Sequence, residues 1–256
     1  MSRELLELAE RTAREAGAQL RDAFGRTDLV VTSKSSDTDL VSEADHAAEA
    51  LIRRRLEAAR PGDGILGEEE GDAAGTTGVR WVVDPLDGTV NFLFGIPQWC
   101  VSIACEDAGG TIAGVVYDPL RDELWSAERG GAARRDGIDV QGSRQADLSQ
   151  AMVATGFSYD AEARAAQGAA VARLLPHVRD IRRFGAAALD LAWAAGGRYD
   201  AFYERGLNHW DLAAGALLCE RAGLEVVALG DDAPGGSGVL VAAPALVAEL
   251  REILGE

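Results

Sequence analysis

The chain has 256 residues, of which 47% are hydrophobic and 26% charged, a composition that suits a soluble globular protein with one large core or two small domains that share one. Asp and Glu number 42 against 25 Lys and Arg, so the formal net charge is −17. This acidity argues against nucleic acid and anionic membrane surfaces as partners.

The cysteines and the N-terminal segment indicate where the protein works. Cys100, Cys105 and Cys219 are an odd number without metal-site spacing, which indicates reduced structural thiols. Residues 1–17 are charged and helix-patterned, unlike a signal peptide. No apolar run reaches the roughly 18 residues of a membrane span. We therefore expect a cytoplasmic protein.

The first half of the chain, residues 1–142, combines two helices with several strands. Apolar residues at helical spacing predict helices over 3–24, ending at Gly25, and over 44–60, closed by Pro61-Gly62. A polar loop is expected over 33–38 and a surface loop over 71–78. Strand patterns cover 29–32, 64–67, 80–84, 101–106, 111–117 and 123–127. This half resembles an α+β arrangement with an antiparallel meander.

The second half, residues 143–256, follows a polar segment without periodicity at 137–150, where we place the domain boundary. Strands are predicted over 151–155, 180–182, 201–203, 224–227 and 238–242. Helices are predicted over 161–175, 186–195, 210–222 and 245–254. Alternation of strands with helices indicates a layered α/β half.

The stretch WVVDPLDGTVNF, residues 81–92, places two aspartates around a proline after an apolar strand. Because proline cannot donate to the sheet ladder, we expect the strand to end there and leave Asp84 at its carboxyl end, with Asp87 one turn away. Gly88 and Thr89 would open a short helix over 90–93, whose backbone N–H groups form an anion site. Taken alone, the motif is equally explained by an Asp-capped turn.

Two other acidic positions strengthen the functional interpretation. Glu68 directly follows a short apolar strand, although acidic runs are usually solvated. Asp211 lies in the first turn of a predicted helix, where an aspartate alone would complement the helix dipole. Together, Glu68, Asp84, Asp87 and Asp211 supply four carboxylates, which suit Mg²⁺ or Mn²⁺. Four negative charges balance two divalent cations that a phosphate could bridge, as in a two-metal phosphatase.

The ordered set of motifs resembles the inositol monophosphatase family of Mg²⁺-dependent, lithium-sensitive phosphomonoesterases. The main signatures are WVVDPLDGTVNF, WDLAAG (210–215) and the upstream GEE (67–69). Further similarity lies in DLVSEAD (39–45), GIPQWCVSIA (95–104), GFSYD (156–160) and YERGLNHWD (203–211). The resemblance spans nearly the whole chain. It implies a layered αβαβα sandwich with the site between the halves and, because the family is commonly dimeric, a homodimer.

The resemblance also implies the metal ligands. One Mg²⁺ would be held by Glu68, Asp84 and the backbone carbonyl of Leu86. The second would be held by Asp84, Asp87 and Asp211, so that Asp84 bridges the two ions. Mn²⁺ is expected to substitute for Mg²⁺.

The expected catalytic residues are Asp45, Glu68 and Thr89. The Thr89 hydroxyl, hydrogen-bonded to Asp45, would help to activate the attacking water. Glu69 would lie behind the metal ligands, near a weaker third ion. The N–H groups of Gly88 and Thr89 would hold the phosphate. These roles are carried over from the family motifs.

The substrate is less closely defined than the reaction. The family often has Thr-Asn after DGT and His before the Gly-Ile/Phe-Pro segment, whereas this chain has Val90-Asn91 and Phe94. Glu204 matches the position that binds sugar-alcohol hydroxyls, which favours a phosphorylated sugar alcohol such as inositol 1-phosphate. Histidinol phosphate is the alternative substrate. A non-catalytic regulatory binding protein on the same fold is the alternative of a different class.

Four basic residues remain as further candidates. Arg182, Arg183 and Arg205 could receive a second anionic group of the substrate. His209 precedes Trp210-Asp211, so a catalytic role is conceivable, although the metal site already supplies the base.

Overall fold

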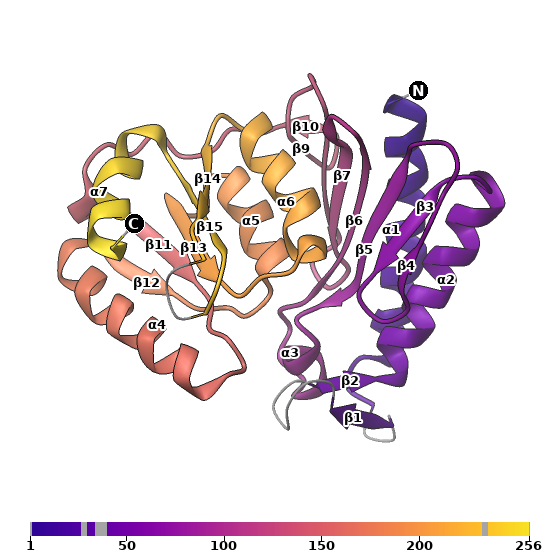
Figure 1. The fold of residues 1–256 in the computed structure, drawn as a ribbon, viewed down its shortest axis with the longest axis horizontal. Coiled ribbons are helices and arrows are strands. Elements are labelled where there is room, and N and C mark those ends of the chain that lie inside the picture. Colours follow the sequence, from indigo (N-terminus) through magenta and orange to yellow (C-terminus); the bar gives the residue numbers. More distant parts are fainter. Residues whose placement is uncertain (1, 27–29, 34–39, 232–234, 256) are drawn as a thin grey trace.

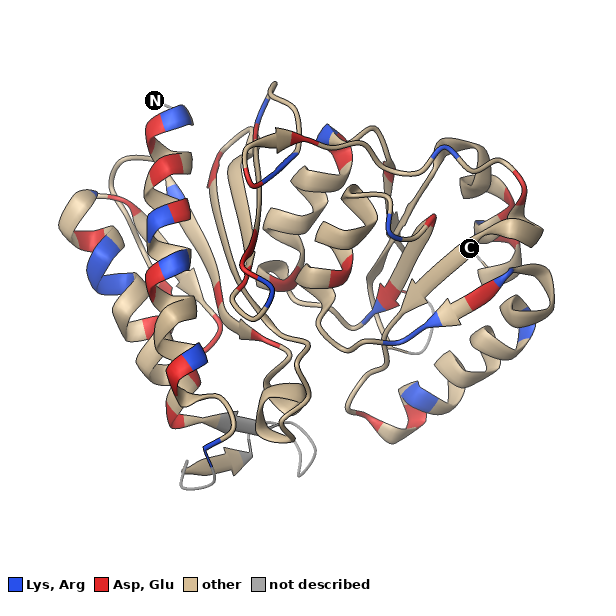
Figure 2. Ribbon diagram, turned by 180° about the vertical axis from the view of Figure 1, so that it is seen from behind, with Lys and Arg blue, Asp and Glu red and all other residues tan. Residues whose placement is uncertain are grey.

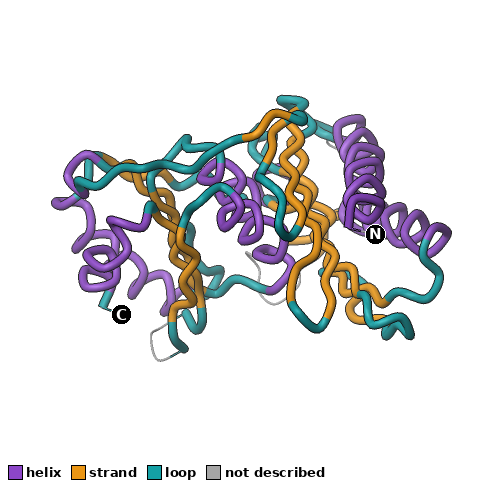
Figure 3. The backbone as a smooth tube through the Cα atoms, turned by 90° about the horizontal axis from the view of Figure 1, so that it is seen from above, coloured by secondary structure: helices purple, strands orange, loops and turns teal. Residues whose placement is uncertain are grey.

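The computed structural model describes residues 2–26, 30–33, 40–231 and 235–255, which form five layers (Figure 1). Helices α1 (Ser2–Ala23) and α2 (Glu43–Ala59) cover one face of an eight-stranded sheet. Helices α5 (Ala187–Ala195) and α6 (His209–Arg221) separate it from a five-stranded sheet, whose far face is covered by α4 (Ala161–Leu174) and α7 (Val247–Leu254). The view from above shows the same succession of layers (Figure 3). The predicted αβαβα sandwich is confirmed.

The eight-stranded sheet has the order β10-β9-β8-β7-β6-β5-β3-β4 and is antiparallel except for the β3–β5 pair. Its strands are β3 (Gly64–Gly67), β4 (Gly71–Ala73), β5 (Arg80–Asp87), β6 (Cys100–Asp107), β7 (Gly110–Asp118), β8 (Glu123–Glu128), β9 (Arg134–Arg135) and β10 (Ile138–Asp139). A separate antiparallel pair joins β1 (Val31–Ser33) to β2 (Leu40–Ser42), and the short helix α3 spans Thr89–Leu93.

The five-stranded sheet has the order β12-β11-β13-β15-β14. Its strands are β11 (Met152–Thr155), β12 (Asp180–Arg182), β13 (Ala201–Arg205), β14 (Glu225–Leu229) and β15 (Gly238–Ala242). The strands β12, β11 and β13 run parallel, whereas β15 runs antiparallel to both β13 and β14. Three-residue 3₁₀ turns at Leu148–Gln150, Leu175–His177 and Pro244–Leu246 complete the connections.

The central helices explain how both sheets share one core. Every residue of α5 is buried, as expected for an apolar helix enclosed between two sheets. Small residues let α5 and α6 approach closely, since a Cβ on Gly215 would lie 2.5 Å from the Cβ of Leu191. In contrast, acidic and basic residues alternate along the outer helix α1, and the central helices are mostly neutral (Figure 2). The placement of the proposed boundary at residues 142/143 stays a prediction.

Two expectations about the first half were wrong. The strand does not end at Pro85, because β5 continues to Asp87 through a β-bulge in its pairing with β6. The segment 71–78 is not all loop, because Gly71–Ala73 pairs with β3 as an edge strand. The expected loop at 33–38 lies largely outside the described residues, as does residue 29 of the strand expected at 29–32.

Two further observations concern the cysteines and the length of the helices. Cys100, Cys105 and Cys219 are free and buried. None of the helices that the structure describes is long and apolar enough to cross a membrane.

Candidate active site

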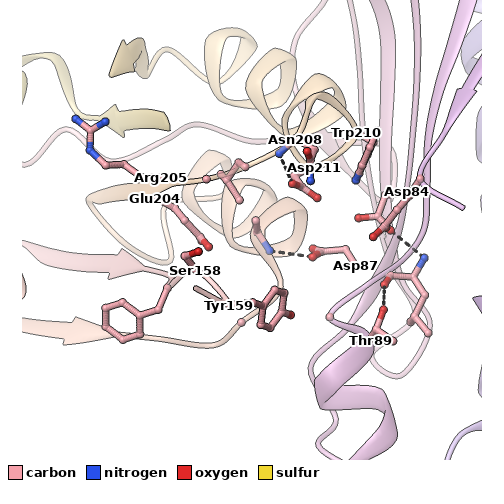
Figure 4. A pocket seen from close by; sticks show the side chains of 18 of the residues that line it. Asp84, Asp87, Thr89, Ser158, Tyr159, Glu204, Arg205, Asn208, Trp210 and Asp211 are labelled. Atoms are coloured by element: carbon pink, nitrogen blue, oxygen red, sulfur yellow. Dashed lines mark hydrogen bonds between the residues drawn. The ribbon is translucent and has the colours of Figure 1, made fainter. Parts of the chain in front are cut away.

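A polar pocket of about 520 Å³ brings most of the predicted site residues together, whereas Asp45 and Glu69 are not in its lining among the described residues (Figure 4). Its wall includes four residues of the first half and two of the second: Glu68, Asp84, Asp87, Thr89, Glu204 and Asp211. These residues come from segments up to 143 positions apart in the chain. The pocket therefore lies between the two halves, as the motifs implied.

The bulge in β5 aims two of the carboxylates at this pocket. In a regular strand, residues 84 and 87 would point to opposite faces because side chains alternate. Here Asp84 pairs with Ser102 and Asp87 with Cys100, so three steps on β5 match two steps on β6. The extra residue lets Asp84 and Asp87 line the same pocket. Asp84 Oδ1 also accepts the N–H of Leu86 at 3.0 Å, which fixes the bulge.

Asp87 joins the two halves of the molecule. Its Oδ1 accepts the backbone N–H of Ala187 at 3.1 Å, and its Oδ2 accepts those of Ala188 and Leu189 at 2.8 and 3.3 Å. The Asp87 carboxylate thus caps the N-terminus of α5 from a distant strand, where the helix dipole favours negative charge. The Cys100 thiol adds a weak donor at 3.5 Å.

Asp211 and Glu68 reach the pocket from the two halves. Asp211 lies in the first turn of α6, where its Oδ2 accepts the N–H of Asn208 at 2.6 Å. Glu68 follows β3, and its N–H donates to the Val83 carbonyl at 3.2 Å. Both carboxylates are therefore held at the ends of regular elements, which restricts where they can point.

Thr89 and Asp45 make the predicted contact. The Thr89 hydroxyl lies 2.8 Å from Asp45 Oδ1 and 3.0 Å from the Leu86 carbonyl oxygen. Asp45 is buried in the first turn of α2, where its Oδ2 accepts both the N–H and the hydroxyl of Ser42 at 2.9 and 2.6 Å. This capping box fixes the orientation of the carboxylate that faces Thr89.

Burial and like charge make the site electrostatically unfavourable without a cation. Burial raises the pKa of Asp84 well above its usual range, and the charges of Glu68, Asp87 and Asp211 raise it further. Burial raises the pKa of Asp87 to about 6, although the N–H groups of α5 oppose this shift. Burial, followed by the charge of Asp87, raises the pKa of Asp211 to about 8. Divalent cations would relieve this repulsion.

The donor set fits hard cations in its chemistry. Four carboxylates and the Leu86 carbonyl supply oxygen ligands of the kind that Mg²⁺ uses. Among the described residues, however, no group of three Asp, Glu, His or Cys side chains has the spacing of a metal site. The carboxylates are thus gathered around one pocket, where a bound cation would offset the repulsion between their charges.

Glu204 forms the opposite wall of the pocket. In Figure 4 it points inward from the side facing Asp84 and Asp87. Its carboxylate is seated against Gly156, where an added Cβ would lie 2.0 Å from Glu204 Oε2. Burial raises the pKa of Glu204 well above its usual range, and the positive charge of Arg183 opposes that shift.

Several candidates lie elsewhere. Within the described chain, the pocket lining does not include Glu69, Arg182 or His209. His209 Nε2 lies 2.8 Å from Glu106 Oε2, and Arg182 donates to Asp180. The structure thus gives His209 a partner outside the pocket.

Two residues that support the site were not predicted from the sequence. The buried carboxylate of Glu49 accepts the N–H groups of Glu69 and Glu70 at 2.8 and 3.1 Å, and so holds the turn that carries Glu68. Asn91 Nδ2 donates to the carbonyls of Gln98 and Phe184, both at 2.8 Å, and ties α3 to the loop before α5. Glu49 could have been noticed from the sequence because Arg53 follows it four residues later on a predicted helix, at the spacing of an ion pair.

Comparison with known proteins identifies the family. The model of the inositol monophosphatase family matches residues 1–255. Inositol-1-monophosphatase SuhB of Mycobacterium tuberculosis (strain H37Rv) is 44% identical over an alignment of 277 positions. The alignment covers 98% of this chain and 93% of that protein. The Nus factor SuhB of Escherichia coli K12 is 43% identical over 221 residues, covering 86% and 83%.

The solved structures agree as well. The extragenic suppressor protein suhB of Bartonella henselae superimposes with a TM-score of 0.92 at 36% identity, covering 99% of both chains. A family model that matches almost every residue, relatives above 40% identity and the shared fold all lead to one assignment. The chain belongs to the inositol monophosphatase family.

Proposed function

We propose that this protein is a Mg²⁺-dependent phosphatase that hydrolyses a small phosphate monoester, with inositol 1-phosphate as its substrate. Membership of the inositol monophosphatase family supports a phosphatase activity. One observation carries the finer proposal: carboxylates from separate segments line one pocket beside the Thr89–Asp45 hydrogen bond.

The metal ligands follow from the arrangement of the pocket. Glu68, Asp84 and the Leu86 carbonyl would hold one divalent cation, and Asp84, Asp87 and Asp211 the second. When bound, the two cations would lower the pKa of the attacking water and neutralise charge on the phosphate and the leaving alkoxide. Lithium is expected to inhibit by competing at this site.

Thr89 orients the attacking water. Its hydroxyl has one proton, which it donates in a hydrogen bond to the buried carboxylate of Asp45 at 2.8 Å. Its lone pairs are then free to accept a proton of the water, and the Leu86 carbonyl keeps a lone pair for a cation. Because Ser42 fixes Asp45 from the other side, the Thr89 hydroxyl is held in this donor direction.

The start of α3 would bind the phosphate. The first N–H groups of any helix lack partners within it. Gly88 precedes α3 with a φ of +93°, and both Gly88 and Thr89 line the pocket. Their N–H groups would donate to phosphate oxygens and help to align the phosphorus with the water.

Glu204 would bind the alcohol portion of the substrate. A carboxylate across the pocket from the metal ligands is suited to accept hydrogen bonds from hydroxyl groups. The printed name of the mycobacterial relative, inositol-1-monophosphatase, supports inositol 1-phosphate. Histidinol phosphate remains the alternative, because its cationic amine would also pair with Glu204.

A regulatory binding protein is the alternative of a different class. The Escherichia coli relative is named as a Nus factor. All the carboxylates that a catalytic site requires are present in this chain, which favours the enzyme. The homodimer, the third ion near Glu69 and the cytoplasmic location also remain predictions.

Steady-state kinetics test the proposal. Purified protein with Mg²⁺ is assayed for phosphate release from inositol 1-phosphate and histidinol phosphate, with and without lithium. We expect a higher kcat/KM for inositol 1-phosphate and inhibition by lithium. A hundredfold preference for histidinol phosphate would reverse the choice of substrate. No release from any of a panel of monoesters would support the regulatory alternative.

A further inference from the structure

Two arginine side chains lie in the wall of an otherwise acidic pocket. The lining includes six carboxylates, those of Glu68, Asp84, Asp87, Asp160, Glu204 and Asp211, and two arginines, Arg183 and Arg205. Four of the carboxylates are accounted for as metal ligands, and Asp160 caps α4 by accepting the N–H of Ala163 at 2.8 Å. Glu204 and the arginines remain to meet the rest of the substrate.

Of the two arginines in the pocket lining, Arg183 is the one placed to meet the substrate. Arg205 Nη1 donates to the carbonyls of Gly230 and Gly236, both at 2.6 Å. Its side chain points away from the acidic residues in Figure 4. The guanidinium of Arg183, in contrast, has no hydrogen bond or ion pair with any residue that the structure describes, and it is exposed to the pocket.

Two features hold the Arg183 guanidinium in position. It lies over the ring of Phe157, with its Cζ 5.8 Å from the ring centroid. It also packs against Gly185, where an added Cβ would lie 2.3 Å from Arg183 Nη1. Gly185 also has a φ of +83°, so a side chain at this position would be strained as well as obstructed. The cation is therefore seated without using its hydrogen-bond donors.

The positive charge of Arg183 lowers the pKa of Glu204, although burial raises that pKa by more. Glu204 in turn is seated against Gly156. Glu204, an acceptor, and Arg183, a donor, therefore line the same pocket as the metal ligands.

We propose that Arg183 and Glu204 together form a subsite for two neighbouring hydroxyl groups on the alcohol portion of the substrate. Glu204 accepts a hydrogen bond from one hydroxyl, and Arg183 donates to the oxygen of the next. The inference rests on the proposed function and narrows it to esters that carry a vicinal diol.

A second phosphate fits this wall less well. It would meet one guanidinium but also the carboxylates of Glu204 and Asp160, and the chain as a whole carries a net charge of −17. A neutral diol satisfies the donor and the acceptor together, without bringing like charges into contact.

Matched substrates provide the test. Inositol 1-phosphate and cyclohexyl phosphate share a six-membered ring and a phosphate, but only the first has hydroxyls. We expect Arg183→Ala to lower kcat/KM for inositol 1-phosphate by roughly ten- to a hundredfold, mainly through KM, because a charge-assisted hydrogen bond is lost. The loss on cyclohexyl phosphate is expected to be at least tenfold smaller.

Arg182→Ala is the control variant, since its guanidinium pairs with Asp180 and is outside the pocket. It should leave the preference between the two esters unchanged. Equal losses on both esters in Arg183→Ala, or no loss on either, would overturn the diol subsite. A larger loss on fructose 1,6-bisphosphate than on inositol 1-phosphate would replace it with a site for a second anion.

A binding measurement separates this inference from the proposed function. Calorimetry with the same two esters compares wild type and Arg183→Ala without turnover. Wild type could bind inositol 1-phosphate more tightly than cyclohexyl phosphate, lose this preference in Arg183→Ala, and yet release no phosphate. That result would support the diol subsite and contradict the proposed phosphatase activity. Wild type that binds both esters equally contradicts the subsite, whatever its activity.

Discussion

Replacing Asp87 with asparagine removes a proposed metal ligand without removing the cap of α5. The asparagine oxygen can take the place of Oδ2 and accept the N–H groups of Ala188 and Leu189. Its NH₂ group would then face the N–H of Ala187, which loses its acceptor. One buried donor without a partner destabilises a protein by roughly 1–3 kcal/mol.

Removal of the charge acts in the opposite direction. Without metal, the pKa of Asp87 is raised from 3.8 to about 6. Ionising such a group at pH 8 destabilises the folded protein by roughly 3 kcal/mol relative to a neutral side chain. The two effects together predict a gain of roughly 0–2 kcal/mol for metal-free Asp87→Asn. For a chain of this size, that is an increase in Tm of a few degrees at most.

The assays are thermal unfolding in EDTA and in Mg²⁺, and phosphate release. Asp87→Asn should unfold in EDTA at or slightly above the wild-type Tm, should lose most of the Mg²⁺-dependent increase, and should lose kcat/KM by about a hundredfold or more. Asp139→Asn, at an exposed ion pair with Arg134, is the matched control and should behave as wild type. A large fall in Tm in EDTA, or normal turnover, would refute this reasoning.

Three further outcomes follow from the geometry. The pKa values of Asp87 and Asp211 in the folded protein are raised to about 6 and about 8. The protonated forms therefore stabilise the folded protein fully below about pH 4, and this stabilisation is lost as the pH rises to about 8. The Tm in EDTA should therefore fall between pH 5.5 and 8.5 more than it does in Mg²⁺, and parallel curves would contradict this. Thr89→Val should lower kcat by about a hundredfold at saturating Mg²⁺, whereas Thr89→Ser, which keeps the hydroxyl, should retain most of it; equal losses would exclude the hydroxyl's role. Gly156→Ala should displace Glu204 and raise KM for inositol 1-phosphate more than for cyclohexyl phosphate, and an unchanged KM would show that Glu204 does not touch the alcohol.

Local patterns in the sequence predicted most of the elements and the residues around the pocket. Apolar periodicity located α1, α2 and α4 to within one or two residues, because one face of each helix packs on a sheet or a neighbouring helix. The GEE motif correctly placed Glu68 directly after a strand, whereas Asp84, expected at a strand end, lies within β5, which ends at Asp87. The Thr89–Asp45 contact came from the family resemblance, and the structure bears it out at 2.8 Å.

The parts that could not be predicted depend on contacts distant in the chain. Asp87 caps a helix that begins 100 residues later, which no local pattern reveals. The bulge at Pro85 depends on pairing with β6, so proline was taken as a strand end. The three candidates Arg182, Arg183 and Arg205 are equivalent as basic residues in the sequence, and their different contacts distinguish them only in the folded protein.

A magnesium titration tests the central claim most directly. Protein freed of metal is assayed for phosphate release from inositol 1-phosphate as Mg²⁺ is added, with Asp84→Asn measured in parallel, because Asp84 is the proposed bridge between the two cations. We expect no release without metal, a saturable increase with Mg²⁺ in wild type, and release near background in the variant at every Mg²⁺ concentration. Release in EDTA, or a variant that matches wild type, would contradict the carboxylate metal site.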